Sequence, residues 1–146
     1  MTRPRSRKRF DASSILPPEP RLTFFTDASI GRHIVPTALR AAGLEVVVHD
    51  DRFPPGTLDE DWLAEAGRLN WLVLTKDKRI RYRQIERRAL ERAGVGAFVF
   101  TGKDLTGEEM AQAIVKALPK ILRFARKTSR PFIATVTAGG TVKRLA

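Results

Sequence analysis

The 146-residue chain contains no cysteine and only two histidines, His33 and His49. The absence of cysteine excludes a disulfide scaffold, a thiolate zinc site and a cysteine nucleophile, and it fits a reducing compartment. Two histidines are too few for a histidine-rich metal site. A metal ion bound by this chain would therefore depend on oxygen ligands, which favour hard ions such as Mg²⁺ or Mn²⁺.

Long apolar runs are also missing from the sequence. No segment approaches the roughly 18–20 consecutive apolar residues that a membrane-spanning helix requires. The basic N-terminus is followed by Asp11-Ala12-Ser13-Ser14 rather than by an apolar stretch, so a secretory signal peptide is not expected. We expect a soluble, cytoplasmic protein with no membrane partner.

Acidic residues are scarce relative to basic ones. The chain has 27 Lys and Arg against 16 Asp and Glu, which gives a net charge of +11. Such an excess favours a polyanionic partner, either nucleic acid or an acidic protein, and less readily an anionic membrane. Hydrophobic residues make up 42% of the chain, which is enough to form the core of one domain.

The first twenty residues differ in composition from the rest. Five basic residues precede Leu16-Pro17-Pro18-Glu19-Pro20, where neither a helix nor a central strand can form. We interpret residues 1–20 as a basic, proline-rich arm, either solvated or lying on nucleic acid or a partner. Residues 21–146 are interpreted as the folded domain.

From residue 21 onward, short apolar runs alternate with amphipathic segments. The apolar runs predict strands at 22–26, 45–49, 71–75 and 96–100. The amphipathic segments predict helices at 30–42, 57–68, 79–93 and from 106 onward. Capping boxes are expected at Thr57 and Thr106, and Pro36 and Pro119 are expected to kink their helices. Residues 132–137 and 141–145 predict a closing β-hairpin.

Alternating strands and helices with near-continuous apolar strands indicate an α/β fold with a parallel sheet covered on both faces. Ligands of such sheets bind beyond the carboxyl ends of the strands, where the strand order reverses. The residues that directly follow each strand are therefore the candidates for a functional site.

Acidic residues follow every predicted core strand in this basic chain. They are Asp27 after the first strand, Asp50 and Asp51 after the second, Asp77 after the third and Asp104 after the fourth, with Asp59, Glu60 and Asp61 opening the helix at 57–68. Carboxylates gathered at one sheet edge repel one another, and a divalent cation removes that cost. Such an ion can activate water for in-line displacement at phosphorus. Each acid alone could equally cap a helix or occupy a turn, and it is their joint position that favours a metal site.

Basic residues concentrate around the end of the third strand and in the helix at 79–93. They are Lys76, Lys78, Arg79, Arg81, Arg83, Arg87, Arg88 and Arg92. A solvated helix face could have this composition, but the excess of arginine beside the predicted pocket favours RNA contact. The RNA-binding candidates are Lys76, Lys78, Arg79 and Arg81. Tyr82 could stack on a base, although packing is preferred, and both histidines and both tryptophans are interpreted as structural.

Five motifs in this order, at 24–27, 38–43, 47–51, 59–63 and 72–78, resemble the PIN-like ribonucleases, in particular the compact toxins of VapBC-type toxin–antitoxin pairs. The resemblance covers roughly residues 22–101. It implies a three-layer α/β/α sandwich with a mostly parallel sheet, Mg²⁺-dependent endoribonuclease activity and an antitoxin that blocks the site. Asp27, Asp59 and Asp77 match the family's catalytic, metal-binding acids, and Asp51 matches an acid often found after the second strand.

The chain also departs from the family pattern. Full-size PIN domains carry a glutamate on an early helix, which has no clear counterpart here, and Asp51 or Asp61 could fill that place. The sequence thus predicts a ribonuclease that uses Asp27, Asp59 and Asp77 to hold Mg²⁺, or alternatively Mn²⁺, with Asp51 or Asp61 assisting. The alternative is a non-catalytic basic RNA-binding or protein-interaction module of the same fold. A receiver-like domain would need two acids after the first strand, and the oligomeric state, including a homodimer, stays open.

Overall fold

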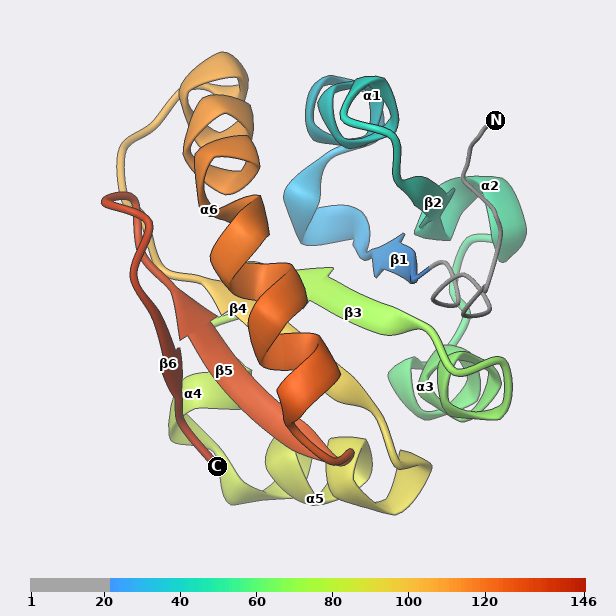
Figure 1. The fold of residues 1–146 in the computed structure, drawn as a ribbon. Coiled ribbons are helices and arrows are strands. Elements are labelled where there is room, and N and C mark those ends of the chain that lie inside the picture. The colour runs from blue at the N-terminus through green and yellow to red at the C-terminus, as the bar shows by residue number, and fades with distance from the viewer. Residues whose placement is uncertain (1–21) are drawn as a thin grey trace, which may run out of the picture.

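Six strands form one mixed sheet at the centre of the structure, a computed structural model that describes residues 22–146 (Figure 1). The strands are β1 Thr23–Thr26, β2 Glu45–Val48, β3 Leu72–Thr75, β4 Gly96–Phe100, β5 Phe132–Val136 and β6 Val142–Arg144. Their order across the sheet is β2-β1-β3-β4-β5-β6. Strands β1 to β5 are parallel and β6 pairs antiparallel with β5, so the predicted α/β fold with its closing hairpin is confirmed. The arm predicted at residues 1–20 lies outside the described residues.

Helices cover both faces of the sheet and give three layers. One face packs against α1 Ile34–Ala41 and α6 Gly107–Lys127. The other face packs against α3 Asp59–Arg68, α4 Arg79–Tyr82 and α5 Gln84–Ala93. Successive strand side chains point to opposite faces, so neighbours such as Phe24 and Phe25 belong to different core clusters. A strand buried on both faces must be apolar throughout, which is why the strands were recognisable in the sequence.

The two predicted capping boxes have different outcomes. At the start of α6 the Thr106 hydroxyl accepts a hydrogen bond from the Glu109 amide at 3.1 Å, and the Glu109 carboxylate accepts one from the Thr106 amide at 2.9 Å. This box is confirmed. The box predicted at Thr57 is wrong, because the Thr57 hydroxyl instead donates to the Pro54 carbonyl at 2.6 Å and closes a turn. Helix α3 begins at Asp59, two residues later than the predicted start at residue 57.

Two predicted helices differ from the observed ones. The helix predicted at 30–42 begins only at Ile34, as α1, and a short 3₁₀ turn, η1 Ala28–Ile30, precedes it. Pro36 lies in the first turn of α1, where a missing amide hydrogen costs no helical bond. The segment at 79–93 is interrupted by Arg83, whose extended backbone separates α4 from α5. Helix α6 continues through Pro119.

The sheet order places the ends of two strands from distant parts of the chain side by side. After β1 the chain adds β2 on one side of β1 and then β3 on the other, so the strand order reverses between β1 and β3. The carboxyl ends of these two neighbours form the switch point at which α/β proteins bind ligands. Within residues 22–146, no helix combines the length and the apolar character needed to cross a bilayer.

Candidate functional site

A pocket of about 370 Å³ lies beyond the carboxyl ends of β1 and β3. Its walls come from η1, from the residues after β2 and β3, and from the first turn of α3. The lining residues are Asp27, Ala28, Ser29, His49, Thr57, Asp59, Trp62, Asp77 and Arg79. The fold thus brings the three acids that were singled out in the sequence, Asp27, Asp59 and Asp77, to one pocket.

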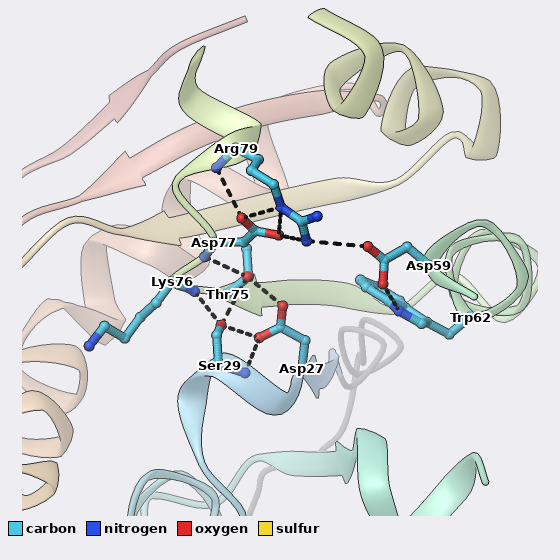
Figure 2. A network of polar contacts seen from close by, with 8 residues as sticks. All are labelled: Asp27, Ser29, Asp59, Trp62, Thr75, Lys76, Asp77 and Arg79. Atoms are coloured by element: carbon cyan, nitrogen blue, oxygen red, sulfur yellow. Dashed lines mark hydrogen bonds and ion pairs between the residues drawn. The ribbon is translucent and has the colours of Figure 1, made fainter. Parts of the chain in front are cut away.

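Two hydroxyl groups hold the Asp27 carboxylate in place (Figure 2). Asp27 follows β1 and caps η1, where one carboxylate oxygen accepts hydrogen bonds from the amide and the hydroxyl of Ser29. The other oxygen accepts a hydrogen bond from the Thr75 hydroxyl at 2.6 Å. Thr75, the fully buried last residue of β3, also accepts a hydrogen bond from the Asp77 amide at 3.0 Å. One threonine therefore connects the two acids across neighbouring strands.

Burial and hydrogen bonding shift the pKa of Asp27 in opposite directions. Desolvation raises the pKa of the Asp27 carboxyl above its ordinary value, and the hydrogen bonds from Ser29 and Thr75 offset only part of this increase. The nearby charge of Asp77 raises the pKa of Asp27 further. Asp27 therefore holds a proton more readily than a free aspartate does, a property typical of functional carboxyls.

The Asp77 carboxylate is bound by Arg79 through several hydrogen bonds. Its oxygens accept from the Arg79 amide at 2.9 Å, from Nε at 3.0 and 3.1 Å, and from Nη2 at 2.6 Å. These hydrogen bonds hold the pKa of Asp77 below its ordinary value. The same Nη2 lies 3.6 Å from a carboxylate oxygen of Asp59. Arg79 thus bridges two of the three acids (Figure 2).

Asp59 is oriented by a buried tryptophan. It is the first residue of α3, and its other carboxylate oxygen accepts a hydrogen bond from Trp62 Nε1 at 3.0 Å. The Trp62 ring packs against Phe25 of β1 with 5.0 Å between centroids. Trp62 and Trp71 are both buried, as predicted. The core therefore fixes the position from which Asp59 enters the pocket.

Glu86 is a fourth acid at the site, and it was not among the predicted site residues. It lines a smaller cavity of about 40 Å³ that shares Asp27, Asp59 and Asp77 with the main pocket. Its Oε2 atom is buried, and no hydrogen-bond partner for it lies among the described residues. The charges of Asp59 and Glu86 both contribute to a raised pKa of Arg79, after the larger effect of Asp77. The Arg79 guanidinium therefore lies amid several carboxylates.

Ser29, Thr75 and His49 are further site residues that sequence reasoning missed. His49 lines the pocket, forms a 2.9 Å contact with Asp50, and packs its ring edge-on against Phe25. These contacts agree with the structural role expected for His49. The hydroxyls of Ser29 and Thr75 carried no charge pattern that could have drawn attention to them. The available signal was their spacing of two residues from Asp27 and Asp77.

Several predicted site residues lie outside the pocket. Asp51 lies 3.6 Å from Arg32, and Asp61 is exposed on α3. Lys78 is exposed, and the Lys76 side chain extends away from the carboxylates in Figure 2. Of the four predicted RNA-binding residues, only Arg79 lines the pocket. The preference for a packing role of Tyr82 is wrong, because its side chain is 71% exposed.

The side chains of the pocket have the chemistry to bind a metal ion, but their placement does not suit one. Carboxylates from three parts of the pocket lining supply the oxygen ligands that Mg²⁺ prefers. Within residues 22–146, however, no group of three or more Asp, Glu, His or Cys side chains lies close enough to hold an ion. Arg79 supplies positive charge to Asp77 and Asp59 instead. As placed, the side chains do not fit a preformed metal centre.

Comparison with known proteins produced one match. A family model described as "PIN like domain" matches residues 22–102, which is more than half of the chain. The matched region runs from β1 past the end of β4 and contains every residue that lines the pocket. No curated protein and no solved structure matched the chain.

Proposed function

The chain belongs to the PIN-like domain family, and from that premise we propose that it is an endoribonuclease whose active site is the pocket beside β1 and β3. PIN-like domains are generally nucleases. The proposal is carried by the convergence of Asp27, Asp59 and Asp77 on one pocket of a strongly basic chain. In such a pocket a carboxylate can accept or donate a proton during the reaction. The excess of basic side chains on the chain attracts the RNA backbone.

The contacts suggest separate roles for Asp27 and Arg79. Asp27 has a raised pKa and two hydroxyl partners that fix its direction, which suits a group that accepts a proton from an attacking water. Arg79 carries its positive charge on the exposed side of Asp77, where the guanidinium could exchange a carboxylate for a phosphate. Dependence on Mg²⁺ or Mn²⁺ stays a prediction from the sequence, and these two roles do not require it.

A second candidate function is favoured by the ion pairs of Arg79. Asp59 and Asp77, two carboxylates that would bind a metal ion, are already paired with the guanidinium of Arg79. A non-catalytic module that binds RNA or an acidic protein would keep such a neutralised pocket unchanged. This candidate predicts salt-dependent RNA binding without any cleavage.

An RNA cleavage assay separates the two candidates. A labelled oligoribonucleotide would be incubated with the full chain, with Asp27→Asn and with Asp61→Asn, in Mg²⁺, in Mn²⁺ and in chelator. We expect Asp27→Asn to lower the cleavage rate at least about 100-fold, because a positioned proton acceptor is lost. Asp61→Asn is the matched control and should cleave like the unmodified chain. Binding without cleavage under every condition would overturn the nuclease proposal in favour of the second candidate.

A narrower part of the proposal is the biological role. We propose that the enzyme is the toxin of a type II toxin–antitoxin pair and that an antitoxin binds over the pocket. This part rests on the sequence resemblance to compact PIN-like toxins. Induced expression of the full chain should arrest cell growth, whereas Asp27→Asn should not. Growth arrest by both proteins would separate toxicity from the pocket and contradict the proposed role.

A further inference from the structure

Helix α4 begins at the pocket residue Arg79 and ends with an exposed aromatic side chain. Tyr82, the one tyrosine of the chain, is 71% exposed. Ile85, three residues further along the chain, is 70% exposed. Large apolar side chains that remain in water near a polar pocket are typical of binding surfaces rather than of cores.

The position of Tyr82 follows from the short helix that carries it. Helix α4 begins at Arg79, which lines the pocket, and Tyr82 is three residues further on. Side chains at this spacing are neighbours on a helix, with roughly 5–6 Å between their Cβ atoms. Ile80, between them in sequence, is buried and lines the smaller cavity shared with Asp27, Asp59 and Asp77. The Tyr82 ring is thus attached at the rim of the candidate active site.

Side chains on both helices hold this corner in place. Arg87 of α5 donates from Nε to the Ile80 carbonyl at 3.0 Å and from Nη2 to the Arg81 carbonyl. These are the carbonyls left without helical partners where α4 ends. The Arg81 guanidinium lies 5.0 Å from the centroid of the Tyr82 ring, within the range of a cation–π interaction. The backbone that carries the Tyr82 ring is therefore held in place by Arg87, and the ring has a cationic neighbour in Arg81.

We propose that Arg81 and Tyr82 form a platform on which one unpaired nucleobase stacks while a neighbouring phosphate enters the pocket. The substrate class is then single-stranded RNA, and the inference rests on the nuclease function proposed above. Every base has a face that can stack on a tyrosine, and arginine beside the ring adds attraction for the phosphate backbone. A base inside a duplex is already stacked on its neighbours and cannot lie on the platform without leaving the helix.

The test measures RNA binding separately from cleavage. In the non-cleaving Asp27→Asn chain, Tyr82 would be changed to Ala, Leu or Phe, and binding followed by fluorescence anisotropy. The probes would be a labelled single-stranded oligoribonucleotide and the same sequence as a duplex. We expect Ala and Leu to weaken single-strand binding about 10-fold, whereas Phe stays within about 2-fold. Leu is the matched apolar control without a ring. Duplex binding should not change in any variant.

A second measurement identifies stacking directly. An abasic nucleotide would be placed at successive positions of the single strand. At the position that stacks on Tyr82, the abasic probe should bind Tyr82→Ala and the parent chain equally. Unchanged single-strand binding by Tyr82→Leu, or equal losses for single strand and duplex, would overturn the platform. Absence of RNA binding by the parent chain would overturn it as well.

The outcomes for the platform and for the nuclease function remain distinguishable. If the unmodified chain never cleaves RNA but Tyr82→Leu still loses single-strand binding, the platform stands and the nuclease proposal fails. If the unmodified chain cleaves RNA and the Tyr82→Leu variant of the non-cleaving chain binds the single strand normally, the nuclease proposal stands and the platform fails. Because Tyr82 is exposed, each variant should retain the thermal unfolding midpoint of the parent chain, which circular dichroism checks.

Discussion

At the scale of single residues, Asp27 shows how a candidate functional residue can oppose stability. The carboxyl is surrounded by protein, so its ionised form loses solvation that Ser29 and Thr75 replace only in part. A raised pKa in the folded chain means that folding favours the protonated form. Below pH 3.8, the ordinary pKa of the group, protonated Asp27 makes its full contribution to the stability of the fold. This contribution is lost as the pH rises through the raised pKa of the folded chain. Near neutral pH the ionised Asp27 therefore destabilises the fold.

We predict that Asp27→Asn raises the stability of the chain at neutral pH. The amide cannot ionise, and it keeps an acceptor for Ser29 while its NH₂ group faces the Thr75 hydroxyl. That hydroxyl can turn toward Ser29 Oγ, which lies 3.2 Å away. Thermal unfolding followed by circular dichroism should give a higher midpoint than for the unmodified chain at pH 7.5, and the difference should shrink as the pH falls toward 3.8. The exposed Asp61→Asn should show no such dependence. A lower midpoint for Asp27→Asn at neutral pH would show that the carboxylate hydrogen bonds outweigh desolvation.

Arg79 neutralises part of the negative charge of the pocket by pairing with Asp77 and Asp59. Its removal leaves Asp77 and Asp59 without the cation they share. We predict that Arg79→Ala increases the affinity of the pocket for Mn²⁺ by roughly tenfold or more, because charge-assisted hydrogen bonds of this kind no longer compete with the ion. Electron paramagnetic resonance of free Mn²⁺ measures this affinity without any need for catalysis. Arg81→Ala, which changes an arginine outside the pocket, is the control.

An unchanged Mn²⁺ affinity in Arg79→Ala would contradict this competition. It would mean that the carboxylates lie too far apart to share an ion even when the guanidinium is absent.

The acids of the pocket were predictable because each follows a strand or opens a helix, and those positions can be read from the apolar pattern. Their partners were not predictable in the same way. The direction of the Arg79 side chain depends on the turn after Asp77, and Glu86 reaches the pocket only because α5 packs beside α3. Such contacts are set by packing between elements, which local sequence does not specify.

At the scale of elements, the division of the predicted helix at 79–93 shows the same limit. Residues 79–93 have helical spacing, yet the backbone of Arg83 is extended. Arg87, four residues later, binds the carbonyls of Ile80 and Arg81 that the break leaves open. A continuous helix would have satisfied these groups itself. After the break, Arg79 at the start of α4 lines the pocket, and the side chain of Tyr82 at its end is exposed.

We predict that Arg87→Ala destabilises the chain by about 1–3 kcal/mol, because two backbone carbonyls lose a charged donor. Arg88→Ala, which changes the adjacent exposed arginine, should alter the free energy of unfolding by no more than about 0.5 kcal/mol. Urea unfolding of both variants measures the difference. Equal effects of the two substitutions would show that the corner of α4 and α5 does not depend on Arg87.

At the scale of the whole molecule, the order of the strands brings the site together. Sequence reasoning predicted a mostly parallel sheet and a site at the strand ends, but apolar strands of similar length do not reveal their neighbours. Only when β1 lies beside β3 do Asp27 and Asp77 reach the same threonine. The position of the pocket thus depends on topology, and the short crossovers through α1 and α3 make that topology possible.

Basic charge is also distributed over the whole molecule and is not confined to the pocket. After Glu109 the sequence contains no acid, while Lys116, Lys120, Arg123, Arg126, Lys127, Arg130, Lys143 and Arg144 are basic. Lys120, Arg123 and Lys127 line a separate hollow between α6 and β6. Salt dependence can show whether RNA uses this surface or the residues beside the pocket. Each phosphate contact contributes about −0.7 to the slope of log K against log salt for a single strand.

If the four predicted RNA-binding residues each contact one phosphate, the slope for the single-stranded oligoribonucleotide should be about −3. Affinity should then fall about 50-fold between 50 and 200 mM salt. Anisotropy titrations of the non-cleaving Asp27→Asn chain measure the slope.

A Lys76→Gln, Lys78→Gln double variant should make the slope shallower by about 1.4. The double variant Lys120→Gln, Arg123→Gln removes the same charge from α6 and should leave the slope unchanged. A shallower slope in the second variant alone would place the phosphate contacts on α6. It would thereby separate RNA binding from the pocket.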